Sequence, residues 1–263
     1  MSLKGKVALV TGGTRSIGRG ISMALAKEGC KVAMNYVNDD EAAEWTLNRF
    51  KKEGWEGVAI KNDLAEVDEC KEIVRRANEA FGQVDIFVHN ATVGNRDVIA
   101  KTSDEVWDKV INVNLRAAFV MARELIPAMT DRKYGRIVTI SSQLAEVGGS
   151  YGHLMQGQGR APYSAAKAGL VALTKGMAHE GSPYITANVV APSGTQRKIA
   201  EERGEEWPPD PSAADDERRK GGMILGRMGT PEDVAAAVIY LVSDSGCFLT
   251  GQTIHVSGGH HLP

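Results

Sequence analysis

A tyrosine and a lysine four positions apart combine the residue types and spacing that best suit chemistry in this sequence. Tyr163 and Lys167 lie within residues 161–170, where Pro162 suits a first helical turn and the alanines favour continuation. On the predicted helix the two side chains share one face. A phenol titrates near pH ~10 in water, and an ammonium one turn away favours the phenolate and lowers that pKa. The pair therefore predicts a tuned general acid or base.

Two hydroxyl groups precede this helix at the end of a predicted strand. The β-branched run from Arg136 to Ile140 predicts a strand, and Ser141 and Ser142 follow it. Open α/β sheets bind ligands at the carboxyl ends of their strands. Both hydroxyls are therefore expected where a ligand would bind.

Composition limits the classes of protein to consider. The chain has 263 residues, 43% of them hydrophobic, and 31 basic against 33 acidic side chains give a net charge of −2. This balance argues against a nucleic-acid footprint, and no apolar run is long enough to span a membrane. The first residues, Met1 to Lys6, lack the apolar region of a signal peptide. Cys30, Cys70 and Cys247 lack disulfide or metal-site spacing, so we expect unpaired thiols, a cytoplasmic location and no bound metal.

The start of the chain predicts a cradle for phosphate. An apolar strand from Lys6 to Val10 runs into a glycine-containing turn, residues 11–18, and then a helix that Gly29 ends. Backbone amides at a helix N-terminus attract pyrophosphate, and Gly12 and Gly18 would let the main chain approach it closely. The alternative interpretation is an ordinary strand-to-helix connection.

The end of the second predicted strand bears on cofactor choice. In a fold that binds NAD, an acidic residue usually faces the ribose hydroxyls about 20 residues beyond the glycines. Asn35 and Tyr36 stand there instead, so no carboxylate would repel a 2′-phosphate. Arg15 could pair with that phosphate, although a solvated surface arginine is the alternative.

The remaining segments continue an alternation of strands and helices. We expect strands at Lys31–Tyr36, Gly57–Lys61, Val84–Val88, Ile185–Ala191 and Thr253–Val256, and helices at about Asp40–Lys52, Val67–Phe81, Ser103–Met129 and from the Thr230 cap through Val242. No linker or repeat interrupts the series. The sequence therefore predicts one α/β domain over residues 1–263, doubly wound and Rossmann-like, with a mainly parallel sheet of about seven strands and helices on both faces.

Two polar residues within apolar segments need an explanation. His89 follows a predicted strand, and no neighbour pairs with it as a metal ligand or catalytic partner, so we interpret it as structural. Asn114 lies in the middle of a long apolar helical pattern. A buried asparagine is costly unless its hydrogen bonds are satisfied, so it either relieves a kink or belongs to a site.

These motifs, in this order, resemble those of the short-chain dehydrogenase/reductase family. The resemblance covers nearly the whole chain and is strongest to carbonyl reductases related to β-ketoacyl-carrier-protein reductase. It rests on Thr11-Gly12-x3-Ser16-Ile17-Gly18, Asp63, Asn90-Ala91, Asn114, Ile140-Ser141-Ser142, Tyr163-x3-Lys167, Pro192 and Gly251-Gln252-Thr253.

The resemblance implies four catalytic residues. Tyr163 would donate a proton to a substrate carbonyl oxygen, and Ser142 would hydrogen-bond the same oxygen. Lys167 would bind the nicotinamide ribose and lower the pKa of the tyrosine, and Asn114 would hold a proton-relaying water. The dinucleotide would contact Gly12, Thr14, Arg15, Ser16, Ile17, Gly18, Asn35, Tyr36, Asp63, Leu64, Asn90, Ala91, Thr92, Tyr163, Lys167, Pro192, Ser193 and Thr195.

Some positions depart from the family pattern. Ser16, Thr92 and Ser193 stand where the family usually has glycine, and each adds a side chain near the cofactor. A serine can still offer its amide or hydroxyl to phosphate, so we expect altered affinity rather than lost binding. Ser142 and Tyr163 also stand further apart along the chain than is common in the family.

The favoured function is NADPH-dependent hydride transfer between a nicotinamide and a carbonyl or secondary alcohol of 3-oxoacyl, ketone or polyol type, with NADP(H) preferred over NAD(H). The alternatives are an enoyl reductase, dehydratase or epimerase on the same scaffold, or a non-catalytic dinucleotide sensor. Helices at about residues 114–129 and 163–180 carry apolar or small residues around much of their surface, which predicts a symmetric oligomer, as in the family a homotetramer. A monomer with two well-buried helices is the alternative.

Two segments are expected to cover the substrate. Residues 147–160 are rich in glycine yet partly apolar, and they connect Ser142 to Tyr163. An insertion at about residues 194–229 carries Trp207 between prolines and charged runs. Active-site lids have this placement. A solvated surface excursion is the alternative for the second segment.

Overall fold

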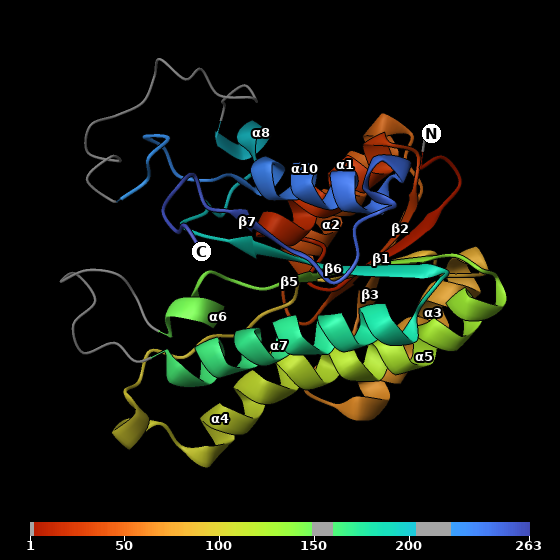
Figure 1. The fold of residues 1–263 in the computed structure, drawn as a ribbon. Coiled ribbons are helices and arrows are strands. Elements are labelled where there is room, and N and C mark those ends of the chain that lie inside the picture. Colours follow the sequence, from red (N-terminus) through yellow and green to blue (C-terminus); the bar gives the residue numbers. More distant parts are fainter. Residues whose placement is uncertain (1–2, 149–159, 204–221) are drawn as a thin grey trace.

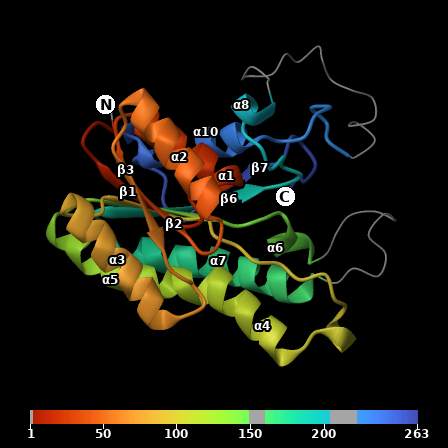
Figure 2. The same ribbon diagram turned by 180° about the vertical axis from the view of Figure 1, so that it is seen from behind.

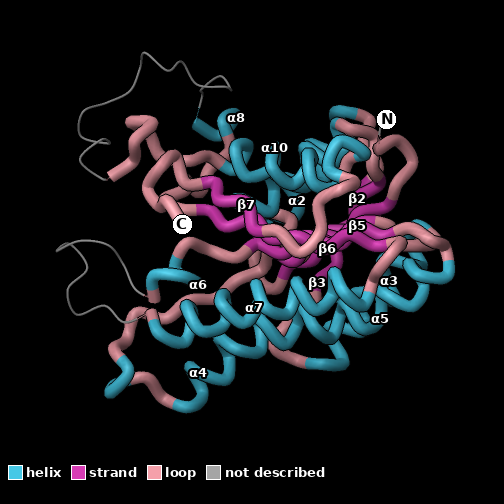
Figure 3. Tube along the Cα trace, in the orientation of Figure 1, coloured by secondary structure: helices cyan, strands magenta, loops and turns pink. Residues whose placement is uncertain are grey.

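A seven-stranded parallel sheet organises the part of the chain that the structure, a computed structural model, describes: residues 3–148, 160–203 and 222–263. The strand order is β3-β2-β1-β4-β5-β6-β7, and every pair of neighbours is parallel. Figure 3 shows this sheet between two layers of helices. The strands are β1 (Val7–Val10), β2 (Lys31–Tyr36), β3 (Gly57–Lys61), β4 (Ile86–His89), β5 (Gly135–Ile140), β6 (Ile185–Pro192) and β7 (Thr253–Val256).

Helices cover both faces of the sheet (Figures 1 and 2). One face carries α1 (Ser16–Lys27), α2 (Asp40–Glu53) and α10 (Pro231–Val242), and the other carries α3 (Val67–Phe81), α4 (Asp104–Ile111), α5 (Ala117–Asp131) and α7 (Ala161–Glu180). The short helices α6 (Leu144–Val147) and α8 (Ala200–Arg203) follow β5 and β6.

Alternation along the strands explains why there are two cores. Successive side chains of a strand point to opposite faces. In β1, Val7 and Leu9 pack in the core that includes α3 and α5, whereas Ala8 and Val10 pack in the core that includes α1 and α10. All four are buried, because helices cover both faces, as a continuous apolar strand predicts.

The predicted fold class is confirmed, and most element bounds are close to those expected. β2, β3, α3 and β7 have the predicted bounds, and α10 ends at Val242, whereas β4 begins at Ile86 rather than Val84. Thr230 caps α10 through a reciprocal hydrogen-bonded box with Asp233, and Pro231 occupies the first turn. The long helical pattern at residues 103–129 is divided, because a π-helical turn, Asn112–Arg116, separates α4 from α5.

The first and last residues of the insertion expected at about residues 194–229 lie side by side. Thr195 pairs with Gly229, and the Gly229 amide donates to the Gly194 carbonyl at 3.1 Å. Residues 149–159 and 204–221, which include most of the first expected cover and Trp207, lie outside the described residues. No helix in the described ranges is long and apolar enough to cross a membrane.

Candidate active site

A cavity of about 480 Å³ opens at the carboxyl edge of the sheet, where β5, β6 and the start of α7 converge. Parallel strands bring their carboxyl ends to one edge, which explains how residues far apart in sequence meet there. Several lining residues were singled out from the sequence: Ile17, Asn90, Thr92, Ser142, Tyr163, Lys167, Pro192, Ser193 and Thr195. Arg160, Gln143 and His260 also line the cavity and were not anticipated.

Tyr163 sits among hydroxyl groups. Its phenol shares the cavity with the side chains of Ser142 and Thr92, and desolvation raises its pKa above the usual value of 10.0. Hydrogen bonding with those two hydroxyls and the charge of Arg160 lower the pKa, but the effect of burial prevails. The phenol therefore holds its proton at neutral pH. Arg160 precedes Tyr163 by three positions at the start of α7, a helical spacing that could have identified it from the sequence.

Lys167 is buried below the tyrosine. Its side chain is 1% exposed, Nζ donates to the Ile140 carbonyl at 2.7 Å, and Nζ lies 5.7 Å from the centre of the Tyr163 ring. Desolvation lowers the pKa of Lys167 to about 7. The predicted shared face is thus present, but the expected lowering of the tyrosine pKa is not, since burial acts on both groups and favours their neutral forms.

Asn114 is fully buried in the π-helical turn. Its amide nitrogen donates to the carbonyls of Val93 at 2.7 Å and Val110 at 2.8 Å, and its amide oxygen accepts from the Thr92 hydroxyl. Because Thr92 and Tyr163 line the same cavity, Thr92 connects Asn114 to the surroundings of the phenol. Asn114 therefore hydrogen-bonds the main chain at an irregular helical turn and also lies next to the candidate site, so each of the two roles considered for it holds in part.

The glycine turn is bound to the end of β4. The Thr11 hydroxyl accepts from the amides of Asn90 at 2.9 Å and Ala91 at 3.0 Å, and the Asn90 side chain donates to the Thr11 and Gly12 carbonyls. A Cβ on Gly18 would lie 1.9 Å from the Gly12 oxygen, so no side chain fits there. The main chain is thus close-packed where α1 begins.

Ser16 adopts a backbone conformation that suits glycine. Its φ is 52°, in the left-handed region that L-residues seldom occupy. This explains why glycine is usual at this family position. Thr14 is buried in the same turn, and its carbonyl accepts from Arg19 Nε at 2.9 Å and from the Thr46 hydroxyl at 2.8 Å.

Arg15 is exposed beside the end of β2. Its side chain is 63% exposed and pairs with Asp39 at 3.3 Å. Tyr36 donates from its hydroxyl to Asp40, which also pairs with Lys61 at 2.7 Å. Acidic side chains therefore do stand near this edge, a few positions after the place where an acid is usual.

Three of the expected cofactor residues are engaged within the protein. Asn35 is buried, and its side chain donates to the carbonyls of Ile60 at 3.3 Å and Asn62 at 3.0 Å. Asp63 accepts from the Ala65 amide at 2.9 Å, and the Leu64 side chain packs in the core. The Asp63 carboxylate is exposed and can accept further hydrogen bonds, whereas the side chains of Asn35 and Leu64 are turned to the protein interior.

His89 lies beneath the site and is completely buried. Its Nδ1 atom lies 3.3 Å from the Thr11 hydroxyl. Desolvation and then the nearby charge of Lys167 lower its pKa to about 3, so the ring is neutral at physiological pH. This environment fits the structural role inferred from the sequence.

The C-terminal segment closes one wall of the cavity. His260 Nδ1 lies 2.5 Å from the Ser193 hydroxyl and 3.2 Å from the Gln143 amide nitrogen. Ser193 therefore gains a partner that a glycine would not have. The Thr195 hydroxyl donates to the Ser193 carbonyl at 2.6 Å. A histidine close to the chain end gives no local sequence signal for this contact, which joins residues more than 60 positions apart.

Comparisons with known proteins cover nearly the whole chain. A family model described as Enoyl-(Acyl carrier protein) reductase matches residues 12–261. The 3-oxoacyl-(acyl-carrier-protein) reductase FabG of Staphylococcus aureus is 35% identical over 258 residues, covering 98% of each chain. An acetoacetyl-CoA reductase of Rhizobium meliloti is 38% identical over 261 residues, covering 98% of this chain and 99% of the relative. A solved short chain dehydrogenase from Burkholderia cenocepacia in complex with NADP has a TM-score of 0.80 and 31% identity, covering 99% of each chain.

Proposed function

Because the chain belongs to the short-chain dehydrogenase/reductase family, we propose that this NAD(P)-dependent oxidoreductase reduces the keto group of a 3-oxoacyl thioester with NADPH. The observation that carries the proposal is the half-buried Tyr163 side chain, which lines one cavity together with Ser142, Thr92 and Lys167. The names of the relatives, 3-oxoacyl-(acyl-carrier-protein) reductase and acetoacetyl-CoA reductase, support the substrate class.

Tyr163 is the proton donor in this proposal. NADPH, when bound, supplies a hydride to the carbonyl carbon. The phenol is protonated at neutral pH, because its pKa lies above 10.0, so Oη holds a proton that it can deliver to the carbonyl oxygen. Ser142, within hydrogen-bonding reach of the same phenol, orients that oxygen. Asn114 acts through Thr92 as a positioning residue, because its amide oxygen accepts from the Thr92 hydroxyl that contacts the phenol.

The dinucleotide would lie along the glycine turn and the mouth of the cavity. The pyrophosphate would lie at the N-terminus of α1, beside the turn that the absence of a side chain on Gly18 allows to pack closely, while Pro192, Ser193 and Thr195 line the nicotinamide side. Lys167 would hydrogen-bond the nicotinamide ribose. Arg15 is the cation available for a 2′-phosphate, and it must then exchange its contact with Asp39 for one with the phosphate.

A second candidate activity is reduction of a 2-enoyl thioester, because the matching family model carries that description. In that reaction a proton is delivered to carbon rather than to a carbonyl oxygen. The proximity of Ser142 and Tyr163 favours the keto substrate, since both hydroxyls can address one oxygen.

The test is NADPH oxidation by the full chain with matched thioesters. Acetoacetyl-CoA and a 3-oxoacyl carrier protein represent the keto class, and crotonyl-CoA represents the enoyl class. We expect turnover with the keto substrates and none above background with crotonyl-CoA. Turnover with crotonyl-CoA alone, or no NADPH oxidation with either keto thioester, would refute the proposal.

We also propose that the protein assembles into a homotetramer. A groove of about 310 Å³ runs between α5 and α7 and is lined by Phe119, Leu173 and Met177 among others. Phe119 is 47% exposed, and Ala165 and Ala168 are exposed on α7, whereas Leu170 is buried against the sheet. An outward apolar face beside a buried one supports contact with a second subunit.

Buried thiols at Cys30 and Cys70 support a reducing, cytoplasmic setting.

A further inference from the structure

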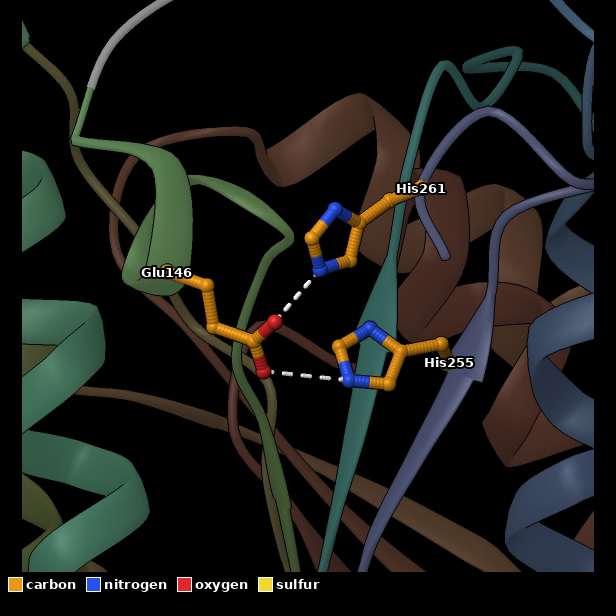
Figure 4. Close-up of side chains that lie close together, drawn as sticks. All are labelled: Glu146, His255 and His261. Carbon is orange, nitrogen blue, oxygen red and sulfur yellow. Dashed lines mark hydrogen bonds and ion pairs between the residues drawn. The ribbon is translucent and has the colours of Figure 1, made fainter. Parts of the chain in front are cut away.

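Two histidines and one glutamate from separate segments converge beside the wall formed by His260. Glu146 belongs to α6, His255 to β7, and His261 to the C-terminal segment. Figure 4 shows both imidazole rings directed at the Glu146 carboxylate, each through its Nε2 atom. His255 Nε2 lies 3.1 Å from one carboxylate oxygen, and His261 Nε2 contacts the other.

The spacing of these groups suits a metal ion. One ligand atom from each residue can be chosen so that all three lie within 4.8 Å of one another. In a tetrahedral Zn²⁺ site with bonds of about 2.1 Å, ligand atoms lie roughly 3.4 Å apart, so small side-chain rotations are sufficient. Two imidazoles and one carboxylate are a donor set that first-row divalent ions prefer.

The surroundings allow an ion to enter. The side chains of His255 and His261 are 12% and 9% exposed, whereas Glu146 is 39% exposed. The imidazoles are thus held in place while the carboxylate side remains open to solvent. The buried Nδ1 atom of His255 has no hydrogen-bond partner among the described residues, so the polar contact of this ring within the described part of the chain is the one from Nε2 to Glu146.

We propose that Glu146, His255 and His261 bind a divalent transition-metal ion, with Zn²⁺ as the reference ion. The ion fastens the C-terminal segment to α6, the helix that follows Ser142, and to the edge strand β7. The site is independent of the proposed reduction, in which the metal takes no part. The bound ion instead stabilises the cavity wall, because His260, next to His261, contacts Ser193 and Gln143.

The direct test is Zn²⁺ binding by the full chain after treatment with a chelator and desalting. Competition with a chromophoric chelator measures affinity and stoichiometry. We expect one ion per chain, and a loss of affinity of at least about 100-fold in His255→Gln, His261→Gln and Glu146→Gln, since a direct ligand matters more than its supporting contacts. Glu146→Gln changes an exposed side chain and keeps the test independent of the packing of β7.

Matched variants separate this site from other donors. His179→Gln, at an exposed histidine of α7, Cys247→Ser, at the exposed thiol, and His153→Gln, outside the described residues, should each leave affinity unchanged. Zn²⁺ should also raise the unfolding temperature of the natural chain but not that of His261→Gln. Absence of stoichiometric binding, or binding retained when all three proposed ligands are replaced, would overturn the assignment.

Discussion

Tyr163 and Lys167 are subject to the same physical effect with opposite outcomes for their pKa values. Burial disfavours charge, so it raises the pKa of the phenol and lowers that of the ammonium. At neutral pH the phenol is protonated, while Lys167, with a pKa of about 7, is divided between its two forms. A tyrosine with its ordinary pKa of about 10 is already protonated at neutral pH, and desolvation reinforces that donor state, whereas the sequence alone indicated a tyrosine whose pKa is lowered by its lysine neighbour.

The buried Lys167 predicts a particular dependence of stability on pH. Between about pH 7 and 10 the folded lysine has released a proton that the unfolded one keeps, so the free energy of unfolding rises with pH through this group. Lys167→Met removes the effect. The excess stability of the variant over the natural chain should be constant below pH 7 and shrink by roughly 1.4 kcal/mol per pH unit above it.

Urea unfolding of both proteins at several pH values measures that difference. Subtracting one curve from the other removes the contributions of Cys30 and Cys70, which are the same in both proteins. The raised pKa values of these thiols lower the free energy of unfolding as the pH rises above 9. Parallel curves for the two proteins between pH 7 and 9 would show that Lys167 is not desolvated in the folded state.

Arg15 and Asp39 predict opposite effects on cofactor choice. The Asp39 carboxylate, 3.3 Å from the Arg15 guanidinium, competes with a 2′-phosphate for the same donor. Asp39→Asn should raise the preference for NADPH over NADH, and Arg15→Ala should lower it, each by about 3- to 10-fold in the ratio of kcat/KM values. Asparagine still caps α2, where the Asp39 side chain accepts from the Ala42 amide, so the fold is preserved. Shifts of the same sign in both variants would contradict this account.

At the scale of elements, the strained start of α1 gives a stability prediction. Ser16 has a φ of 52°, which costs an L-residue about 1 kcal/mol relative to glycine. Ser16→Gly should therefore raise the free energy of unfolding by about 1 kcal/mol, a gain partly offset by the greater freedom of glycine in the unfolded chain. Gly18→Ala in the same turn is the matched opposite, because its Cβ would lie 1.9 Å from the Gly12 oxygen. The midpoints of urea unfolding, measured at equal protein concentration, compare both variants with the natural chain. A lower midpoint for Ser16→Gly would show that the serine side chain stabilises the fold by more than its backbone conformation destabilises it.

Local patterns explain which elements could be predicted from the sequence. β1 is apolar on both faces, and Thr230 with Pro231 marks the start of α10, so both are specified by neighbouring residues. The π-helical turn around Asn114 is different. The Asn114 side chain forms hydrogen bonds with Val93 and Thr92, which belong to another segment of the chain. The pattern of apolar residues alone does not reveal that contact.

At the scale of the whole molecule, the face of α5 and α7 predicts self-association. Ala168 is exposed on α7, the helix that contributes Leu173 to the groove lined by Phe119 of α5. Ala168→Arg places a charge on this face and should shift the mass from tetramer towards dimer or monomer in light scattering at micromolar concentration. Ala80→Arg, at an exposed alanine of α3, is the control and should leave the mass unchanged. A natural chain that is already monomeric would refute the assembly.

The site itself was only partly predictable at this scale. Ser142, Tyr163 and Lys167 follow from a strand end and a helical spacing, and the fold places them in one cavity. The Glu146, His255 and His261 cluster joins residues over 100 positions apart, so no local spacing reveals it. It forms because β7 and the C-terminal segment return to the carboxyl edge beside α6 (Figure 1).

The most direct measurement of the central claim is turnover of acetoacetyl-CoA by Tyr163→Phe, together with NADPH affinity from fluorescence titration. Loss of the phenolic proton should lower kcat by at least about 100-fold while NADPH affinity stays within about threefold, because the cofactor cradle is unchanged. Tyr184→Phe, on a tyrosine at the amino end of β6, away from the carboxyl ends of the strands that line the cavity, should behave like the natural chain. Near-normal turnover in Tyr163→Phe would contradict the assignment of Tyr163 as the proton donor.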